Sequence, residues 1–243
     1  MMDPESHNDD STTTKVGDDP TKQRLSEWLR TAIDHHQQNK LEQAQALYRQ
    51  ILGEDPNHAD ALHLLGVIAY QTGNDQAGIE LITKAIARNR LDPFYHNNLG
   101  NIFRKLGKLP AATGCYEEAL RLKPRYAEAH YNLATVLREQ GDLERATEHY
   151  RKALGITPED VEVLNDLAGT LTLQGDVEGA IGCYRVALHL EPDMADLHAN
   201  LGRAFEQQGD TEAAVACYEK AVELEPKHSR AHQYLVDVRN SQT

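Results

Sequence analysis

The sequence predicts an all-α protein, a stack of six helical hairpins that a final helix closes. Three observations carry this prediction. Prolines recur every 34 residues, at Pro124, Pro158, Pro192 and Pro226, with Pro56 in phase two periods before Pro124. The same small and apolar residue types recur at fixed places between the prolines, and the apolar positions follow helical spacing. A fixed period of this length is typical of proteins built by stacking one repeated unit.

Each repeated unit predicts two helices joined by a tight turn. Cutting the sequence in phase with the prolines gives six units without insertions, 25-58, 59-92, 93-126, 127-160, 161-194 and 195-228. In the fourth unit, His130, Leu133, Ala134 and Leu137 share one helical face, and Ala146, Tyr150, Ala153 and Leu154 share a second. Gly141 and Asp142 lie between the two faces, where we expect a turn and a helix cap, and Pro158 ends the second helix.

The remaining elements follow from the same phase. Asp19-Pro20 predicts that the first helix begins near residue 20. The second unit departs most from the pattern, with Gly78, Ile82 and Arg90 in place of the usual Ala, Tyr and Pro. Small residues recur where we expect paired helices to approach closely, at Gly66, Gly100, Ala134, Ala168 and Gly202. Residues 229-239 predict a capping helix, in which Val236 occupies this small-residue position.

The repeat resembles that of the tetratricopeptide repeat (TPR) family over residues 25-228. The resemblance lies in an aromatic or His, Leu-Gly, an aromatic, then Ala, an aromatic and Pro, as in the third unit with His96, Leu99, Gly100, Phe103, Gly107, Ala112, Tyr116, Ala119 and Pro124. It implies a right-handed TPR superhelix, an α-solenoid, in which the first helices line a concave groove. We therefore expect a solenoid over residues 20-240, preceded by a disordered acidic tail at residues 1-19.

Composition limits the classes of partner. The 25 basic and 38 acidic residues give a net charge of −13, which repels a nucleic-acid backbone. No apolar run approaches the roughly 20 residues that cross a membrane, so we expect no membrane partner. Because the first residues lack a basic stretch followed by an apolar one, we also expect a cytoplasmic protein.

The polar residues of the first helices are the candidate binding site. Asn98, Asn132, Asp166 and Asn200 hold one slot, directly before the core Leu, in four consecutive units. An Asn amide both donates and accepts, so a row of them matches the backbone of an extended peptide. The row resembles the asparagine ladder in the TPR half of protein O-linked N-acetylglucosamine transferases, although the carboxylate of Asp166 cannot donate. The other candidate peptide-binding residues are Asn97, Asn101, Tyr131, Arg104, Arg138 and Arg203.

Simpler interpretations compete with this one. The ladder residues also suit local solvation and hydrogen bonds between helices. A clamp for the terminal carboxylate of chaperones is not predicted, because Asn97, Glu162 and Asp166 stand where cations are needed. Histidines that recur once per unit cannot share one zinc ion, and the cysteines at Cys115, Cys183 and Cys217 also reuse one slot. We predict no metal site, no disulfide, no cofactor and no catalytic residue.

The predicted function is that of a non-enzymatic scaffold that binds a peptide segment or a partner helix in the groove. Two alternatives stay open. In one, the chain is the substrate-recruiting lobe of a glycosyltransferase-type enzyme whose catalytic domain lies elsewhere. In the other, it self-associates through its ends or its outer face into a structural scaffold.

Overall fold

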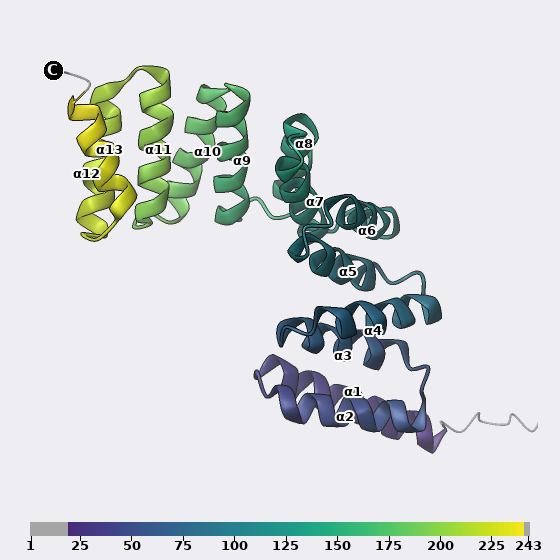
Figure 1. Cartoon of the computed structure of the whole chain (residues 1–243). Coiled ribbons are helices and arrows are strands. Elements are labelled where there is room, and N and C mark those ends of the chain that lie inside the picture. The colour runs from purple at the N-terminus through teal and green to yellow at the C-terminus, as the bar shows by residue number, and fades with distance from the viewer. Residues whose placement is uncertain (1–18, 241–243) are drawn as a thin grey trace, which may run out of the picture.

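A computed structural model describes residues 19–240, which form thirteen α-helices and no strand. The helices are α1 (Pro20–Gln37), α2 (Leu41–Glu54), α3 (Ala59–Gln71), α4 (Asp75–Arg88), α5 (Pro93–Lys105), α6 (Leu109–Leu122), α7 (Ala127–Glu139), α8 (Leu143–Leu154), α9 (Val161–Gln174), α10 (Val177–Leu190), α11 (Ala195–Gln208), α12 (Thr211–Leu224) and α13 (Ser229–Asn240). They pair into six hairpins stacked along a bent path, with α13 at the end (Figure 1). The predicted fold class is confirmed.

A glycine in the left-handed region makes the turn inside five of the six hairpins. Gly73, Gly107, Gly141, Gly175 and Gly209 have φ between 69° and 90°, a conformation that costs other residues energy. The first hairpin uses an asparagine there, Asn39, with φ 57°. Side-chain caps follow the turns in four units, where Asn74, Asp142, Asp176 and Asp210 accept from a backbone N–H of the next helix. The sequence thus fixes both the turn and the start of the helix that follows.

Small residues allow the paired helices to pack closely. A Cβ atom at Gly100 would lie 2.6 Å from the Tyr116 ring, and one at Gly202 would lie 2.5 Å from the Tyr218 ring. Both rings are fully buried. Any side chain at these glycines therefore collides with the core, which confirms the reason given for this position. At the same position in α13, Val236 is 52% exposed, because no further helix packs against it.

The fourth hairpin is the one in which the second helix is short. The other five second helices have 14 residues, whereas α8 has 12 and ends at Leu154. The chain leaves it through Gly155, and the backbone N–H groups of Ile156 and Thr157 both donate to the Ala153 carbonyl. Six residues then lead to α9, and the hairpins from α9 onwards stack in a different direction from those before α5 (Figure 1).

The first helix is capped by a side chain, and the last helix packs against its neighbour α12. Asp19 caps α1 by accepting from the Thr21 N–H, and Ala231, Leu235 and Val238 of α13 are buried. The tail predicted to be disordered lies outside the described residues, apart from Asp19. Within the described range, no helix is both long enough and apolar enough to cross a membrane.

Candidate functional site

Four of the hydrogen bonds that join the first helices of neighbouring hairpins involve the predicted slot, and each of the four joins residues 35 positions apart. We call this set the groove ladder. Its rungs are Asn98 Nδ2 with His63 Nε2 (2.8 Å), Asn132 Nδ2 with Asn97 Oδ1 (3.1 Å), Tyr131 OH with Asp166 Oδ2 (3.1 Å) and Asn200 Nδ2 with Asn165 Oδ1 (3.0 Å). The rungs run without a gap from α3 to α11. The predicted slot thus holds neighbouring units together, as the simpler interpretation requires.

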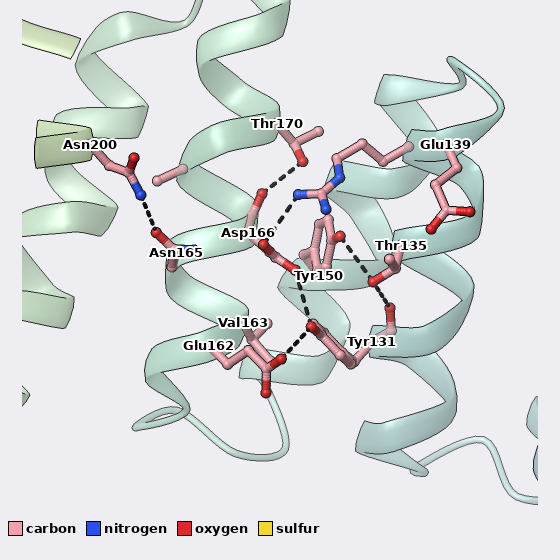
Figure 2. A network of polar contacts seen from close by, with 12 residues as sticks. Tyr131, Thr135, Glu139, Tyr150, Glu162, Val163, Asn165, Asp166, Thr170 and Asn200 are labelled. Atoms are coloured by element: carbon pink, nitrogen blue, oxygen red, sulfur yellow. Dashed lines mark hydrogen bonds and ion pairs between the residues drawn. The ribbon is translucent and has the colours of Figure 1, made fainter. Parts of the chain in front are cut away.

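In each of the three amide rungs, one polar atom of the asparagine has no partner. The Nδ2 group donates to the preceding first helix, whereas no hydrogen bond within residues 19–240 involves Oδ1 of Asn98, Asn132 or Asn200. Figure 2 shows the nitrogen of Asn200 turned to Asn165. A carbonyl oxygen of an amide accepts from a peptide N–H. The amide rungs therefore leave one acceptor per helix.

The acidic rung is different because its carboxylate is already satisfied. Asp166 accepts from Tyr131 through Oδ2, and its Oδ1 lies 3.2 Å from the Arg138 guanidinium. The single O–H of Tyr131 is shared with Glu162, whose Oε1 lies closer, at 2.8 Å, and these contacts form one network (Figure 2). Burial and the two nearby carboxylates raise the pKa of Tyr131, so its hydroxyl stays protonated and donates. Arg138 and Asp166 are thereby tied to each other in the middle of the ladder.

Asn97 departs from the expectation that it faces a peptide. Its side chain is fully buried, donating to Glu128 at 2.9 Å and accepting from Asn132. Asn132 itself is only 7% exposed. Helical phase placed Asn97 on the inner face, but the adjacent helix α7 covers it. The expectation is corrected accordingly: Asn97 connects α5 with α7 and offers no surface to a ligand.

A pocket of about 490 Å³ lies on the first helices of the amino-terminal half. It is lined by Tyr70, Asn101, Arg104, Lys105, Asn132 and Glu139. Tyr116 donates to Asn101 Oδ1 at 2.7 Å, which leaves the Asn101 Nδ2 group free to donate. Arg104 lies 3.2 Å from Glu139, and Lys105 lies 2.8 Å from Asp75. Amide and cationic donors thus surround this half of the groove.

A second pocket, of about 510 Å³, lies on α9, α11 and the start of α13. Its lining combines the apolar Val161, Met194 and Leu197 with Asn165, Asn200, Glu162, Glu191, Asp196 and Arg230. Arg230 is held by Asp196 at 2.8 Å. The exposed Arg203 lies on the same helix as Asn200, with its guanidinium 5.7 Å from the centre of the Tyr234 ring. This half therefore carries more carboxylates than the first pocket.

The recurring histidines have a structural role. His96, His130, His198 and His232 each place Nε2 within 3.2 Å of the backbone carbonyl oxygen six residues earlier, in the preceding loop. The three cysteines are free and half-buried, and burial raises the pKa of Cys115 and of Cys217 to about 11. A thiol with a raised pKa is a poor nucleophile. These side chains belong to packing between units.

Family models for the tetratricopeptide repeat match the chain at residues 29–96, 97–161 and 195–228, and a TPR repeat model matches residues 168–209. Among solved structures, the chain is similar to PilF of Pseudomonas aeruginosa, at 19% identity over 90% of this chain and 100% of PilF, with a TM-score of 0.79. The chain is also similar to PilW, described as a widely conserved type IV pilus biogenesis factor. The identity is 18% over 88% of this chain and 99% of PilW, with a TM-score of 0.77.

A third similar structure is YrrB, described as a TPR protein with an unusual peptide-binding site. It is 19% identical over 76% of this chain and 96% of YrrB, with a TM-score of 0.69. At this identity the likeness to YrrB, PilF and PilW concerns the fold.

Proposed function

Because this chain belongs to the tetratricopeptide repeat family, we propose that it is a scaffold that grips an extended segment of another protein along the groove ladder. The row of unused Oδ1 atoms at Asn98, Asn132 and Asn200 carries the proposal. An extended peptide presents backbone N–H groups at regular intervals, and the three oxygens accept such donors whatever the side chains are. The peptide-binding site named for YrrB supports the same use of this fold.

The proposal assigns different tasks to the two halves of the groove. In the amino-terminal half, the free donors of Asn101 and Arg104 suit carbonyl or carboxylate oxygens of the segment. In the carboxyl-terminal half, Glu162, Glu191 and Asp196 suit a basic side chain beside an apolar one. Arg104 and Arg138 are each held by a carboxylate at 3.2 Å, so both contribute less to a ligand than Arg203.

The finer likeness to the TPR half of O-linked N-acetylglucosamine transferases stays a prediction that rests on the ladder alone. In that case the segment held in the groove is a substrate on its way to a separate catalytic domain. The mode of binding is the same, so the experiment on the groove serves both. Self-association predicts instead that sedimentation gives a mass that rises with concentration.

A peptide library tests the proposal. Segments selected on the wild-type protein are measured against the double variant Asn98→Ala/Asn200→Ala, which spares the buried Asn132. We expect binding about tenfold to a hundredfold weaker, since two backbone hydrogen bonds are lost. The matched control removes two outer amides, Gln43→Ala/Gln50→Ala on α2, and leaves affinity unchanged. Equal affinity for wild type and the ladder variant contradicts the proposal.

A further inference from the structure

A pair of histidines faces a pocket at the ends of α6 and α8, and the groove ladder makes no use of it. The Nδ1 atoms of His130 and His149 lie 3.0 Å apart, and His130 Nε2 lies 3.0 Å from the carbonyl oxygen of Pro124. His130 is 6% exposed, and His149 is half-buried. We call the space beside them the histidine-pair pocket.

The hydrogen bonds fix the protons of the pair. A carbonyl oxygen only accepts, so His130 carries its proton on Nε2 and its Nδ1 accepts. His149 must then donate from Nδ1, which leaves its Nε2 as an unprotonated acceptor. Burial and the neighbouring positive charges lower the pKa of His149 to about 4, and burial also lowers that of His130. The pair is uncharged at neutral pH, although one added proton on His149 Nε2 preserves its bonds.

The pocket combines an apolar lining with positive charge. Its volume is about 560 Å³, and its lining consists of Leu120, Arg121, Pro124, Arg125, His130, His149, Lys152, Gly155 and Ile156. Carboxylates are absent from that set, although Glu118 pairs with Arg121 and Glu148 with Lys152. Arg125 has no ion pair within residues 19–240. Arg145 of α8 also lies near His149, but it is paired with Glu117 and Asp142. In a chain of net charge −13, this concentration of cations is unusual.

Other repeats show that the fold does not require this arrangement. In the sixth unit, His198 also bonds a loop carbonyl, but Cys217 occupies the slot of His149. Asp193, in the loop before the sixth unit, and Glu223 stand in place of Arg125 and Gly155. In the third unit, His96 holds the slot of His130 and Cys115 that of His149. The second histidine, the unpaired arginine and the early end of α8 thus occur together in the fourth unit and the loop before it, without being needed for stacking.

We propose that the histidine-pair pocket binds a phosphate monoester whose apolar body packs on Leu120, Pro124 and Ile156. A dianion gains most from three flanking cations, because phosphate oxygens accept several charge-assisted hydrogen bonds at once. The pairs of Arg121 and Lys152 with Glu118 and Glu148 are exposed, so exchanging them for phosphate costs little. On binding, His149 takes up a proton from solvent on Nε2 and keeps it, donating a charge-assisted hydrogen bond to a phosphate oxygen. This site is independent of the groove.

Calorimetry with phenyl phosphate tests the proposal on the whole chain. We expect one site, in which His149→Cys weakens binding about tenfold, the value of one charge-assisted hydrogen bond. This variant has the combination of His and Cys that the third and sixth units carry at these two slots, so it is expected to fold. Titrations in buffers with different heats of ionisation measure proton uptake, which we expect to be smaller in His149→Cys than in wild type. Arg125→Gln is expected to weaken binding by about fivefold.

Two matched probes decide the ligand class. Benzoate carries the same ring with a single negative charge, and inorganic phosphate carries the charge without the ring. We expect both to bind more weakly than phenyl phosphate. Tighter binding of benzoate overturns the choice of phosphate, and equal binding of phenyl phosphate by wild type, His149→Cys and Arg125→Gln overturns the site itself.

Discussion

The amide rung between Asn132 and Asn97 and the acidic rung between Asp166 and Tyr131 occupy the same slots one repeat apart, yet they differ in what they leave free. The first is buried and neutral, and it keeps the Asn132 carbonyl oxygen unused. The second is partly exposed, and both of its carboxylate oxygens are engaged by Tyr131 and Arg138. The same repeat position therefore leaves an acceptor oxygen unused in one unit and has both oxygens engaged in the next.

Protonation of His63, in the rung nearest the amino terminus, is expected to cause the largest loss of unfolding free energy. Burial lowers the pKa of His63 to about 4, and its Nε2 bonds Asn98 Nδ2. A depressed folded-state pKa means that stability present above pH 6.5 is lost as pH falls towards 4. The loss amounts to roughly 3 kcal/mol. We expect unfolding titrations between pH 7 and 4 to show a smaller loss in His63→Gln, whose amide oxygen still accepts. Parallel pH curves contradict this role of His63.

Removal of the buried amide of Asn132 is expected to cause the second-largest loss of unfolding free energy. Asn132→Ala leaves Asn97 Oδ1 buried without its donor, which costs about 2 kcal/mol of unfolding free energy. The less buried rung provides the comparison, since Asn200→Ala exposes Asn165 to water and costs about 1 kcal/mol. Urea unfolding measures both. If the two variants lose equal stability, burial is not what distinguishes the rungs.

Conversion of the acidic rung into an amide is expected to cause the smallest loss of unfolding free energy. Asp166→Asn loses the pair with Arg138, whose side chain is 28% exposed, at a cost of about 1 kcal/mol or less. Because salt screens an exposed pair, the difference from wild type is expected to shrink as salt rises. A difference that does not change with salt indicates that the hydrogen bond from Tyr131, and not charge, stabilises the rung.

The fold could be predicted from the sequence because each unit repeats the same turn, cap and close-packing residues. Gly141 with Asp142 specifies a turn and a cap, and Gly100 specifies a close approach to Tyr116, so local chemistry and period agree. The ladder slot was visible for the same reason. The hydrogen-bond partners of the slot could not be predicted, because a bond between Asn132 and Asn97 depends on how two helices stack. These residues lie 35 positions apart, and no local sequence pattern indicates that they meet.

The same limit applies to the ends of helices and to charge. Pro158 lies in phase with the other prolines, yet α8 ends earlier because Gly155 favours a break before the proline is reached. The engagement of both carboxylate oxygens of Asp166 depends on Arg138 and Tyr131 of the preceding first helix, α7. Only the packed structure shows that these groups meet.

Site-specific photocrosslinking tests the central claim most directly. A benzophenone side chain replaces Leu173, 67% exposed on the first helix α9, or Val186, 49% exposed on the second helix α10, as a matched aliphatic control. After irradiation with native extract, the account predicts that Leu173 captures a partner segment and that Asn98→Ala/Asn200→Ala reduces this capture. Crosslinks confined to Val186 would contradict the groove as the binding surface.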